Sequence, residues 1–183
     1  MPVVLPLVYF PLKNTLSGAT WNDVEPFYDR PDPIRKIERA SIRAYMEFAR
    51  PILLGKTLDF GCGTRPYKDC VEGEYVGVDQ GDIIPPGPYD TIICNQVLQY
   101  IADIPEMFAL FRQLLRPGGN LVLTFPTNWD EVEPTDLHRF TLAGVWKHLV
   151  AAEFSIVNYQ LRATVCIQDF SFPLGYGIIA RKN

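Results

Sequence analysis

The sequence has no long hydrophobic run, few cysteines and no excess of positive charge. No apolar run reaches the roughly 18 residues that a membrane-spanning helix needs, so we expect no membrane association. Lys and Arg number 17 against 21 Asp and Glu, for a formal net charge of -4. Because no broad positive field exists to hold a phosphate backbone, the composition argues against nucleic-acid binding.

Cysteine is scarce, and the residues that accompany it do not favour a metal site. The four cysteines form no CxxC pair and have no His at ligand spacing: Cys62, Cys70, Cys94 and Cys166. The pattern favours buried thiols over a zinc site or a disulfide framework, so we expect no metal.

The first twelve residues are apolar, but three prolines interrupt them and no basic residue precedes them. This is a poor signal peptide, and we expect a cytoplasmic protein.

The composition predicts one folded domain preceded by an arm. The chain has 183 residues, of which 48% are hydrophobic and 13% aromatic, enough to bury a core. Residues 1–32 are rich in Pro and aromatic residues and lack periodicity, which predicts an irregular N-terminal arm. Residues 33–183 contain no linker or repeat, which predicts a single domain.

Helical and strand-like segments alternate along this domain. A helix is predicted from the Pro33 first turn to about Arg50, with an apolar face of Ile34, Ile37, Ala40, Ala44, Tyr45 and Phe48. Asp103 and Thr141 are predicted to cap two further helices. Strand-like runs lie at 56–60, 75–79, 90–94, 120–125, 154–161 and 175–180. The order predicts an α/β, doubly wound and mostly parallel sheet. The last two strands lack a crossover helix between them, so they are expected to pair antiparallel.

A glycine-rich turn follows the first predicted strand, and an acidic residue ends the second. In Asp59-Phe60-Gly61-Cys62-Gly63-Thr64, the glycines let the backbone bend sharply and approach a ligand. Asp79 lies 20 residues after Asp59, where a carboxylate can accept hydrogen bonds from ribose hydroxyls. Each feature alone is also common in ordinary structure, the strand-end acid more so than the glycine turn. Their order and spacing together favour a nucleoside site.

Five segments make the sequence resemble the class I S-adenosylmethionine-dependent methyltransferases over residues 35–183. The segments are Leu58–Gly63, Tyr75–Asp79, Tyr89–Leu98, Leu115–Gly119 and Pro134–Thr141. The last is similar to a P-x-D-x-x-R-F-T element of a subgroup that often methylates small molecules or sugars. The resemblance implies methyl transfer from S-adenosylmethionine to a small-molecule acceptor, of which saccharides are one class. It does not fix the oligomeric state.

The resemblance also implies which residues contact the cofactor. The methionine end is expected on Asp59, Gly61, Cys62 and Gly63, and the ribose on Asp79. Gln80 and Asn95 complete the expected contacts. Arg65 stands where relatives have a third glycine, and it is expected either to grip the cofactor's carboxylate or to point to solvent.

The chain departs from its relatives between Asp79 and Asp90. Ten residues separate them, too few for the helix and strand that relatives carry there. The sheet is therefore expected to be shortened between the family's second and fourth strands. Asp82-Ile83 is either the remaining adenine-binding pair or part of a turn. Leu98-Gln99-Tyr100 also stands where relatives have Leu-Glu-His.

Methyl transfer from a sulfonium requires mainly that the acceptor and the methyl group are aligned. His138 beside Asp136 is predicted to take a proton from an acceptor hydroxyl; alternatively, His138 packs at the start of the helix that follows. The segment 127–136 either selects a polar or cationic acceptor or is a solvated acidic loop; its acidic residues are Asp130, Glu131, Glu133 and Asp136. Two other functions are compatible with parts of the sequence. One is a non-catalytic relative that binds the cofactor or a protein; the other is a nicotinamide-dependent oxidoreductase, which Pro66 disfavours because G-x-G-x-x-G needs a glycine there.

Overall fold

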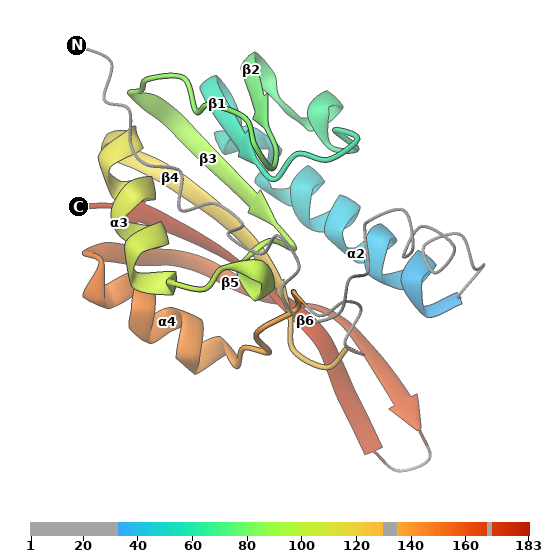
Figure 1. The fold of residues 1–183 in the computed structure, drawn as a ribbon. Helices are drawn as coiled ribbons and strands as arrows, with labels where there is room; N and C mark the ends of the chain where they lie inside the picture. The colour runs from blue at the N-terminus through green and yellow to red at the C-terminus, as the bar shows by residue number, and fades with distance from the viewer. Residues whose placement is uncertain (1–32, 130–134, 168–169) are drawn as a thin grey trace.

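The computed structural model describes residues 33–129, 135–167 and 170–183. The arm predicted for residues 1–32 therefore lies outside the described residues. The described chain forms a six-stranded sheet in the order β2-β1-β3-β4-β6-β5 (Figure 1). The strands are β1 Leu54–Phe60, β2 Glu72–Val78, β3 Tyr89–Asn95, β4 Leu115–Pro126, β5 Phe154–Ile167 and β6 Phe170–Lys182.

The sheet is parallel from β2 to β4 and antiparallel at its C-terminal end. β1 pairs in parallel with β2 and β3, and β3 pairs in parallel with β4. β6 pairs antiparallel with both β4 and β5. The predicted α/β sheet with an antiparallel C-terminal pair is confirmed. The carboxyl ends of β1 to β4 therefore meet at one edge, where ligands bind in folds of this type.

Helices cover both faces of the sheet, and the strands are buried accordingly. α3 (Ile104–Leu114) and α4 (Leu142–Ala151) lie on one face, and α2 (Pro33–Ala49) lies on the other (Figure 1). Along β4, Leu121 and Leu123 belong to the larger core cluster, whereas Val122 belongs to the cluster beneath α2. This alternation follows from the period of two in a strand.

α2 is buried on a different face from the one predicted. Its buried residues are Ile42, Tyr45, Met46 and Ala49, whereas Ile37 and Phe48 are 48% and 47% exposed. Only Tyr45 of the described part of the predicted face is buried. The two stripes are both apolar and adjacent on the helix, so periodicity alone did not select between them. Tyr45 belongs to both stripes, and its ring packs against Gly177 of β6, which has no side chain to displace it.

The connection from β2 to β3 is short, as the residue count predicted. Residues 79–88 contain no helix and no strand. β2 is consequently an edge strand of the sheet. The backbone turns directly after Val78, where Asp82 N donates to Asp79 O at 3.0 Å.

Both predicted helix caps are confirmed. Asp103 Oδ1 accepts a hydrogen bond from Glu106 N at 2.9 Å, and Thr141 Oγ1 accepts one from Gly144 N at 3.0 Å.

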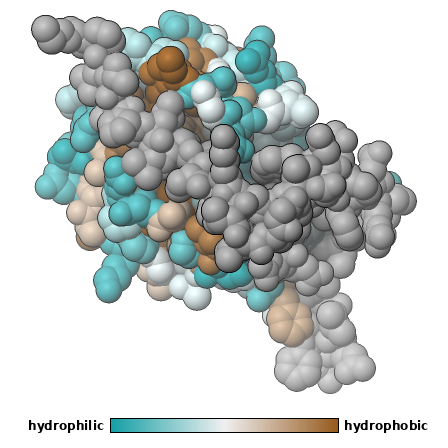
Figure 2. All heavy atoms as spheres, viewed as in Figure 1, coloured by the Kyte–Doolittle hydropathy of each residue, from teal (hydrophilic) through white to brown (hydrophobic). Residues whose placement is uncertain are grey.

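The last two strands are longer than the sequence pattern predicted, and they run beyond the body of the sheet as a long hairpin (Figure 1). No helix in the described parts of the chain combines the length and apolar character needed to cross a bilayer. On the face drawn in Figure 2, described apolar residues occur in separate groups among hydrophilic ones.

Candidate functional site

A cavity of about 300 Å³ opens at the carboxyl edge of β1, β3 and β4. One side is formed by the glycine turn after β1, and the other by α2 and the segments that follow β3 and β4. The residues that line it are Glu38, Arg39, Ile42, Asp59, Gly61, Cys62, Gly63, Thr64, Pro66, Tyr67, Asn95, Gln96, Gln99, Tyr100, Pro126, Trp129, Asp136 and Arg139. Five of the ten predicted cofactor residues belong to this lining.

The glycine turn has the conformation that glycine is needed for. Gly61 and Gly63 have φ values of +73° and +46°, in the left-handed region. A Cβ on Gly61 would lie 2.4 Å from Val97 Cγ2, so close packing excludes any side chain there. A Cβ on Gly63 would meet nothing within 4 Å. The backbone at Gly63 is therefore open to the approach of a ligand.

Asp59 lies at the buried base of the cavity. It is 2% exposed, and its Oδ2 accepts a hydrogen bond from the Tyr75 hydroxyl at 2.6 Å. Burial raises the pKa of Asp59 to about 6, and the bond from Tyr75 acts in the opposite direction. Burial also raises the pKa of the neighbouring Cys62 thiol. The carboxylate is thus an acidic group beside the glycine turn that a cationic end of a ligand would meet at neutral pH.

Asp79 lies directly beside the glycine turn, although it is not part of the cavity lining. The amides of Gly61 and Cys62 both donate to Val78 O, at 2.9 and 3.0 Å. Phe60 and Val78 are register partners, so the ends of the two strands coincide. The exposed Asp79 therefore stands next to the turn at the same sheet edge.

The residues after Asp79 form a turn around it. Gln80 N donates to Asp79 Oδ1 at 2.9 Å, and Asp82 Oδ2 accepts from Asp79 N at 2.9 Å. These contacts match the interpretation of Asp82 as a turn residue. Ile83 is 82% exposed, so this apolar side chain has little protein cover beside the expected nucleoside.

Arg65 stands where relatives have the third glycine of the turn, and its backbone adopts the left-handed conformation that glycine favours. Its φ is +59°, and its amide donates to Cys62 O at 2.8 Å. The side chain is exposed and does not line the cavity. The substitution therefore keeps the shape of the turn at the cost of a left-handed non-glycine residue.

Of the polar residues at and after the end of β3 that line the cavity, only Asn95 was predicted from the sequence to contact the cofactor. Asn95 lines the cavity as predicted; its Nδ2 donates to Met46 Sδ at 3.3 Å. Gln96 has a φ of +55°, which is strained for a residue with a side chain. Its amide satisfies its neighbours when the nitrogen faces Glu38 Oε1 at 3.1 Å and the oxygen faces Arg162 Nη2 at 3.0 Å. Arg162, which contacts Gln96 from β5, was not predicted as a site residue. Its sequence position did offer one indication of a special role, because it is the only charged residue in β5.

His138 and Asp136 do not form the predicted pair. His138 Nε2 lies 2.9 Å from Ile101 O, and its ring centroid is 5.3 Å from that of Phe140. The Asp136 carboxylate is instead held by the Arg139 guanidinium, which also donates to Trp129 O at 3.0 Å. Asp136 and Arg139 line the cavity and His138 does not. The predicted residues Asp130, Glu131 and Glu133 of the acidic segment lie outside the described residues.

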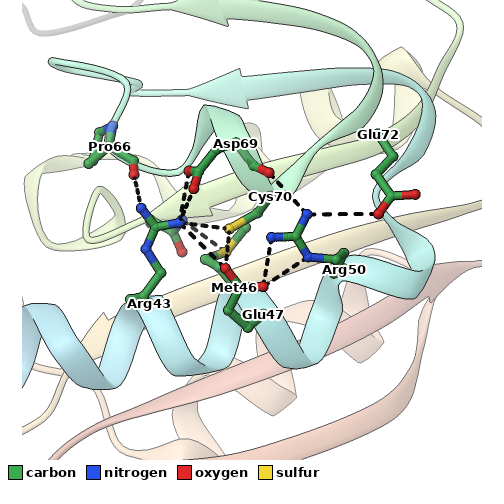
Figure 3. Close-up of polar contacts among 9 residues, drawn as sticks. Arg43, Met46, Glu47, Arg50, Pro66, Asp69, Cys70 and Glu72 are labelled. Carbon is green, nitrogen blue, oxygen red and sulfur yellow. Dashed lines mark hydrogen bonds and ion pairs between the residues drawn. The ribbon is translucent and has the colours of Figure 1, made fainter.

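A network of ion pairs joins α2 to the segment that follows the glycine turn (Figure 3). Arg43 Nη1 contacts Asp69 Oδ1 at 2.8 Å, and its Nη2 donates to Pro66 O at 2.9 Å. Arg50 pairs with Glu47 at 2.7 Å and donates to Asp69 O at 3.0 Å. Glu47, Asp69 and Cys70 would resemble a metal site, but Arg43 Nη1 contacts all three, at 3.5, 2.8 and 3.2 Å (Figure 3). We interpret the network as a support for the turn.

Comparison with known proteins places this geometry in a family. A family model described as a methyltransferase domain matches residues 33–159. Among curated proteins, trans-aconitate 2-methyltransferase of Rhizobium leguminosarum is 32% identical over 73 residues, or 40% of this chain. The match spans only 28% of the length of that relative.

Solved structures share the fold at low sequence identity. An S-adenosylmethionine-dependent methyltransferase from Mesorhizobium loti has a TM-score of 0.59 and 16% identity, covering 80% of this chain and all (100%) of its own. A protein of the same description from Listeria monocytogenes has a TM-score of 0.63 and 15% identity, covering 81% and 99%. Magnesium protoporphyrin IX methyltransferase from Synechocystis, solved with bound S-adenosylhomocysteine, has a TM-score of 0.58 and 16% identity, covering 83% and 88%.

Proposed function

Because the chain belongs to the class I S-adenosylmethionine-dependent methyltransferases, we propose that it transfers a methyl group from this cofactor to a small-molecule acceptor. The family assignment makes it an enzyme, which removes the non-catalytic alternative. We also propose a cytoplasmic location. The free, buried thiols of Cys62, Cys70 and Cys94 support it, because reduced cysteines are typical of that compartment.

The residues of the glycine turn fit the cofactor. When bound, S-adenosylmethionine supplies an activated methyl group. Asp59 would hold its ammonium end, the open backbone at Gly63 would approach its methionine portion, and Asp79 would accept from its ribose hydroxyls. Gln80, Asp82 and Ile83 would border the adenine, and Asn95 and Cys62 would complete the wall. Arg65 is proposed to reach the carboxylate from outside the cavity.

The limited volume of the cavity is the observation that supports a small acceptor. Of about 300 Å³ in total, the methionine end of the cofactor would fill a part, and the remainder has room only for a small acceptor group. Beyond the glycine turn the cavity is bordered by Tyr100, Trp129 and Arg139. These side chains would exclude water and orient the acceptor, which is where most of the rate of methyl transfer arises. The likeness of residues 134–141 to the small-molecule subgroup supports the same class, saccharides included.

The acceptor class is tested by following the methyl group. The protein is incubated with S-adenosylmethionine that carries a tritiated methyl group, together with a cell extract separated into small molecules, protein and nucleic acid. We expect label in the small-molecule fraction and a large loss of it with Asp79→Ala. Label in the protein or nucleic-acid fraction would overturn the small-molecule acceptor.

A further inference from the structure

The two oxygens of the Asp59 carboxylate have different surroundings at the base of the cavity. Oδ2 accepts the hydrogen bond of 2.6 Å from the Tyr75 hydroxyl. Oδ1 accepts no hydrogen bond within the part of the chain that the structure describes, and it is not one of the buried atoms that are closed off without a partner. Because Asp59 lines the cavity, a ligand can meet Oδ1 while Tyr75 keeps Oδ2.

The Tyr75 ring reaches Asp59 along the face of the edge strand β2. Asp59 and Gly77 are register partners, and Tyr75 precedes Gly77 by two residues, so both point to the same face. A Cβ on Gly77 would lie 2.9 Å from Tyr75 Cε1 and 3.1 Å from the Tyr75 hydroxyl oxygen. Glycine weakens the interior of a strand, but here it leaves the space through which the hydroxyl reaches the carboxylate.

The Tyr75 hydroxyl remains a donor to Asp59 at neutral pH. Burial, together with the bond to Asp59, raises the pKa of Tyr75 above its ordinary value, so the hydroxyl keeps its proton. Tyr75 is half-buried, whereas Asp59 behind it is 2% exposed. Burial favours the neutral form of Asp59 and raises its pKa, and the bond from Tyr75 is the main contribution that favours the charged form.

Other groups that face Asp59 do not replace this bond. The charge of Asp79 raises the pKa of Asp59, and the exposed Arg65 lowers it to a smaller extent than the hydrogen bond does. The thiols of Cys62 and Cys94 stay neutral between pH 5 and pH 7, because burial raises the pKa of each.

The remaining charged groups that line the cavity are held in ion pairs or exposed to water, which screens their charge. Glu38 is paired with Arg162, Asp136 is paired with Arg139, and Arg39 is exposed. The bond from Tyr75 is therefore the specific contact that holds the Asp59 carboxylate in place.

We propose that Tyr75 is a positioning residue for the cofactor: its hydroxyl keeps the Asp59 carboxylate ionised and directs Oδ1 at the cofactor's ammonium group. The inference rests on the proposed function, and it assigns a further residue to the same site. Without the hydroxyl, Asp59 takes up its proton at a higher pH. The loss of affinity then falls on ligands that carry the ammonium group.

The test compares Tyr75→Phe with Tyr89→Phe, which removes a hydroxyl that donates to Pro85 O at 2.7 Å, away from the cavity lining. Calorimetry at pH 7 and pH 5 measures the binding of S-adenosylhomocysteine and of methylthioadenosine, which lacks the amino-acid end. Removing one hydrogen bond raises the titration midpoint of a carboxyl group by about one pH unit. Tyr75→Phe should therefore bind S-adenosylhomocysteine about twofold more weakly than the unaltered protein at pH 7, and about tenfold more weakly at pH 5. Methylthioadenosine binding by Tyr75→Phe should be unchanged, as should the binding of both ligands by Tyr89→Phe.

The outcomes separate this inference from the proposed function. If S-adenosylhomocysteine does not bind the unaltered protein, the proposed function is contradicted and the inference falls with it. Normal binding by the unaltered protein overturns the inference alone when the deficit of Tyr75→Phe is the same at both pH values, or is equally large for methylthioadenosine. The same pH-dependent deficit in Tyr89→Phe also overturns it.

A second measurement needs no variant, so the test stands even if Tyr75→Phe does not fold. In the unaltered protein, the NMR chemical shift of Tyr75 Cζ, the carbon that carries the hydroxyl, should change with a midpoint at about pH 6 as Asp59 takes up its proton. A chemical shift that stays constant between pH 7 and pH 5 overturns the inference.

Discussion

Asp59 places a carboxyl group at the buried end of β1, where it contacts the Tyr75 hydroxyl and the cavity. Burial holds its pKa at about 6, above the ordinary 3.8. The group is therefore mainly ionised at pH 7 and mainly neutral at pH 5. A cationic ligand group is attracted only by the ionised form.

The affinity for S-adenosylmethionine should consequently fall about tenfold between pH 7 and pH 5, since the cofactor's own groups titrate outside this range. Calorimetry at several pH values measures this change. Asp59→Asn should bind weakly at both pH values and show a flat profile. A profile that stays steep in Asp59→Asn would assign the titration to another group.

The raised pKa of Asp59 also predicts how the stability of the protein changes with pH. Because the folded pKa of Asp59 is raised above its unfolded value, its stabilising contribution is full below about pH 3.8 and is lost as the pH rises to about 6. Asp59→Asn should therefore raise the free energy of unfolding at pH 7, on the order of 1–3 kcal/mol. Urea unfolding at pH 7 and pH 4 measures it. A gain at pH 4 as large as at pH 7 would contradict the account.

Asp79 carries the ribose assignment. Loss of a charge-assisted hydrogen bond costs about 1.5–3 kcal/mol, so Asp79→Ala should weaken S-adenosylmethionine binding roughly ten- to a hundredfold. Glu74→Ala, on the same edge strand, removes an equal charge away from the turn and serves as the control. An unchanged dissociation constant for Asp79→Ala would remove the ribose assignment.

The His138→Ala variant tests whether His138 has a structural or a catalytic role. In the structure its Nε2 contacts Ile101 O, so His138→Ala should lower stability by about 1–2 kcal/mol and leave cofactor affinity nearly intact. Thermal unfolding and calorimetry measure both quantities. The predicted base would show the opposite pattern: wild-type melting, with turnover reduced about a hundredfold once an acceptor is known.

At the scale of the elements, the packing of α2 on β6 depends on one glycine. A Cβ on Gly177 would lie 2.4 Å from the Tyr45 ring, and Tyr45 is 3% exposed. The ring cannot move away easily because it belongs to the buried cluster under the helix. Because Tyr45 belongs to both the predicted and the observed face, this contact holds the helix on β6 without distinguishing between the two faces.

Gly177→Ala should therefore destabilise the protein by about 1–3 kcal/mol through overpacking. Gly144→Ala, in the first turn of α4, meets only Thr141 Oγ1 at 3.3 Å and should be neutral or slightly stabilising. Chemical unfolding of both variants measures the difference. Equal effects would show that Tyr45 can relax, and that the contact does not fix the helix.

At the scale of the whole molecule, the sequence predicted the elements better than their contacts. Counting residues between Asp79 and Asp90 was enough to predict the shortened connection, because chain length limits what fits. The neighbouring positions of Asp79 and the glycine turn followed from the parallel order of β1 and β2. The pair of Glu38 and Arg162 could not be predicted, because it joins residues 124 positions apart through a hairpin whose register the pattern does not give.

The central claim is that the turn after β1 holds S-adenosylmethionine, and calorimetry on two glycine variants tests it most directly. Gly63 and Gly118 both have positive φ values, +46° and +70°, and a Cβ on either meets nothing within 4 Å. Gly118 lies near the start of β4, at the opposite edge of the sheet. Gly63→Ala should weaken S-adenosylmethionine binding about tenfold or more, and Gly118→Ala should not. No binding by the unaltered protein, or equal loss in both variants, would contradict the account.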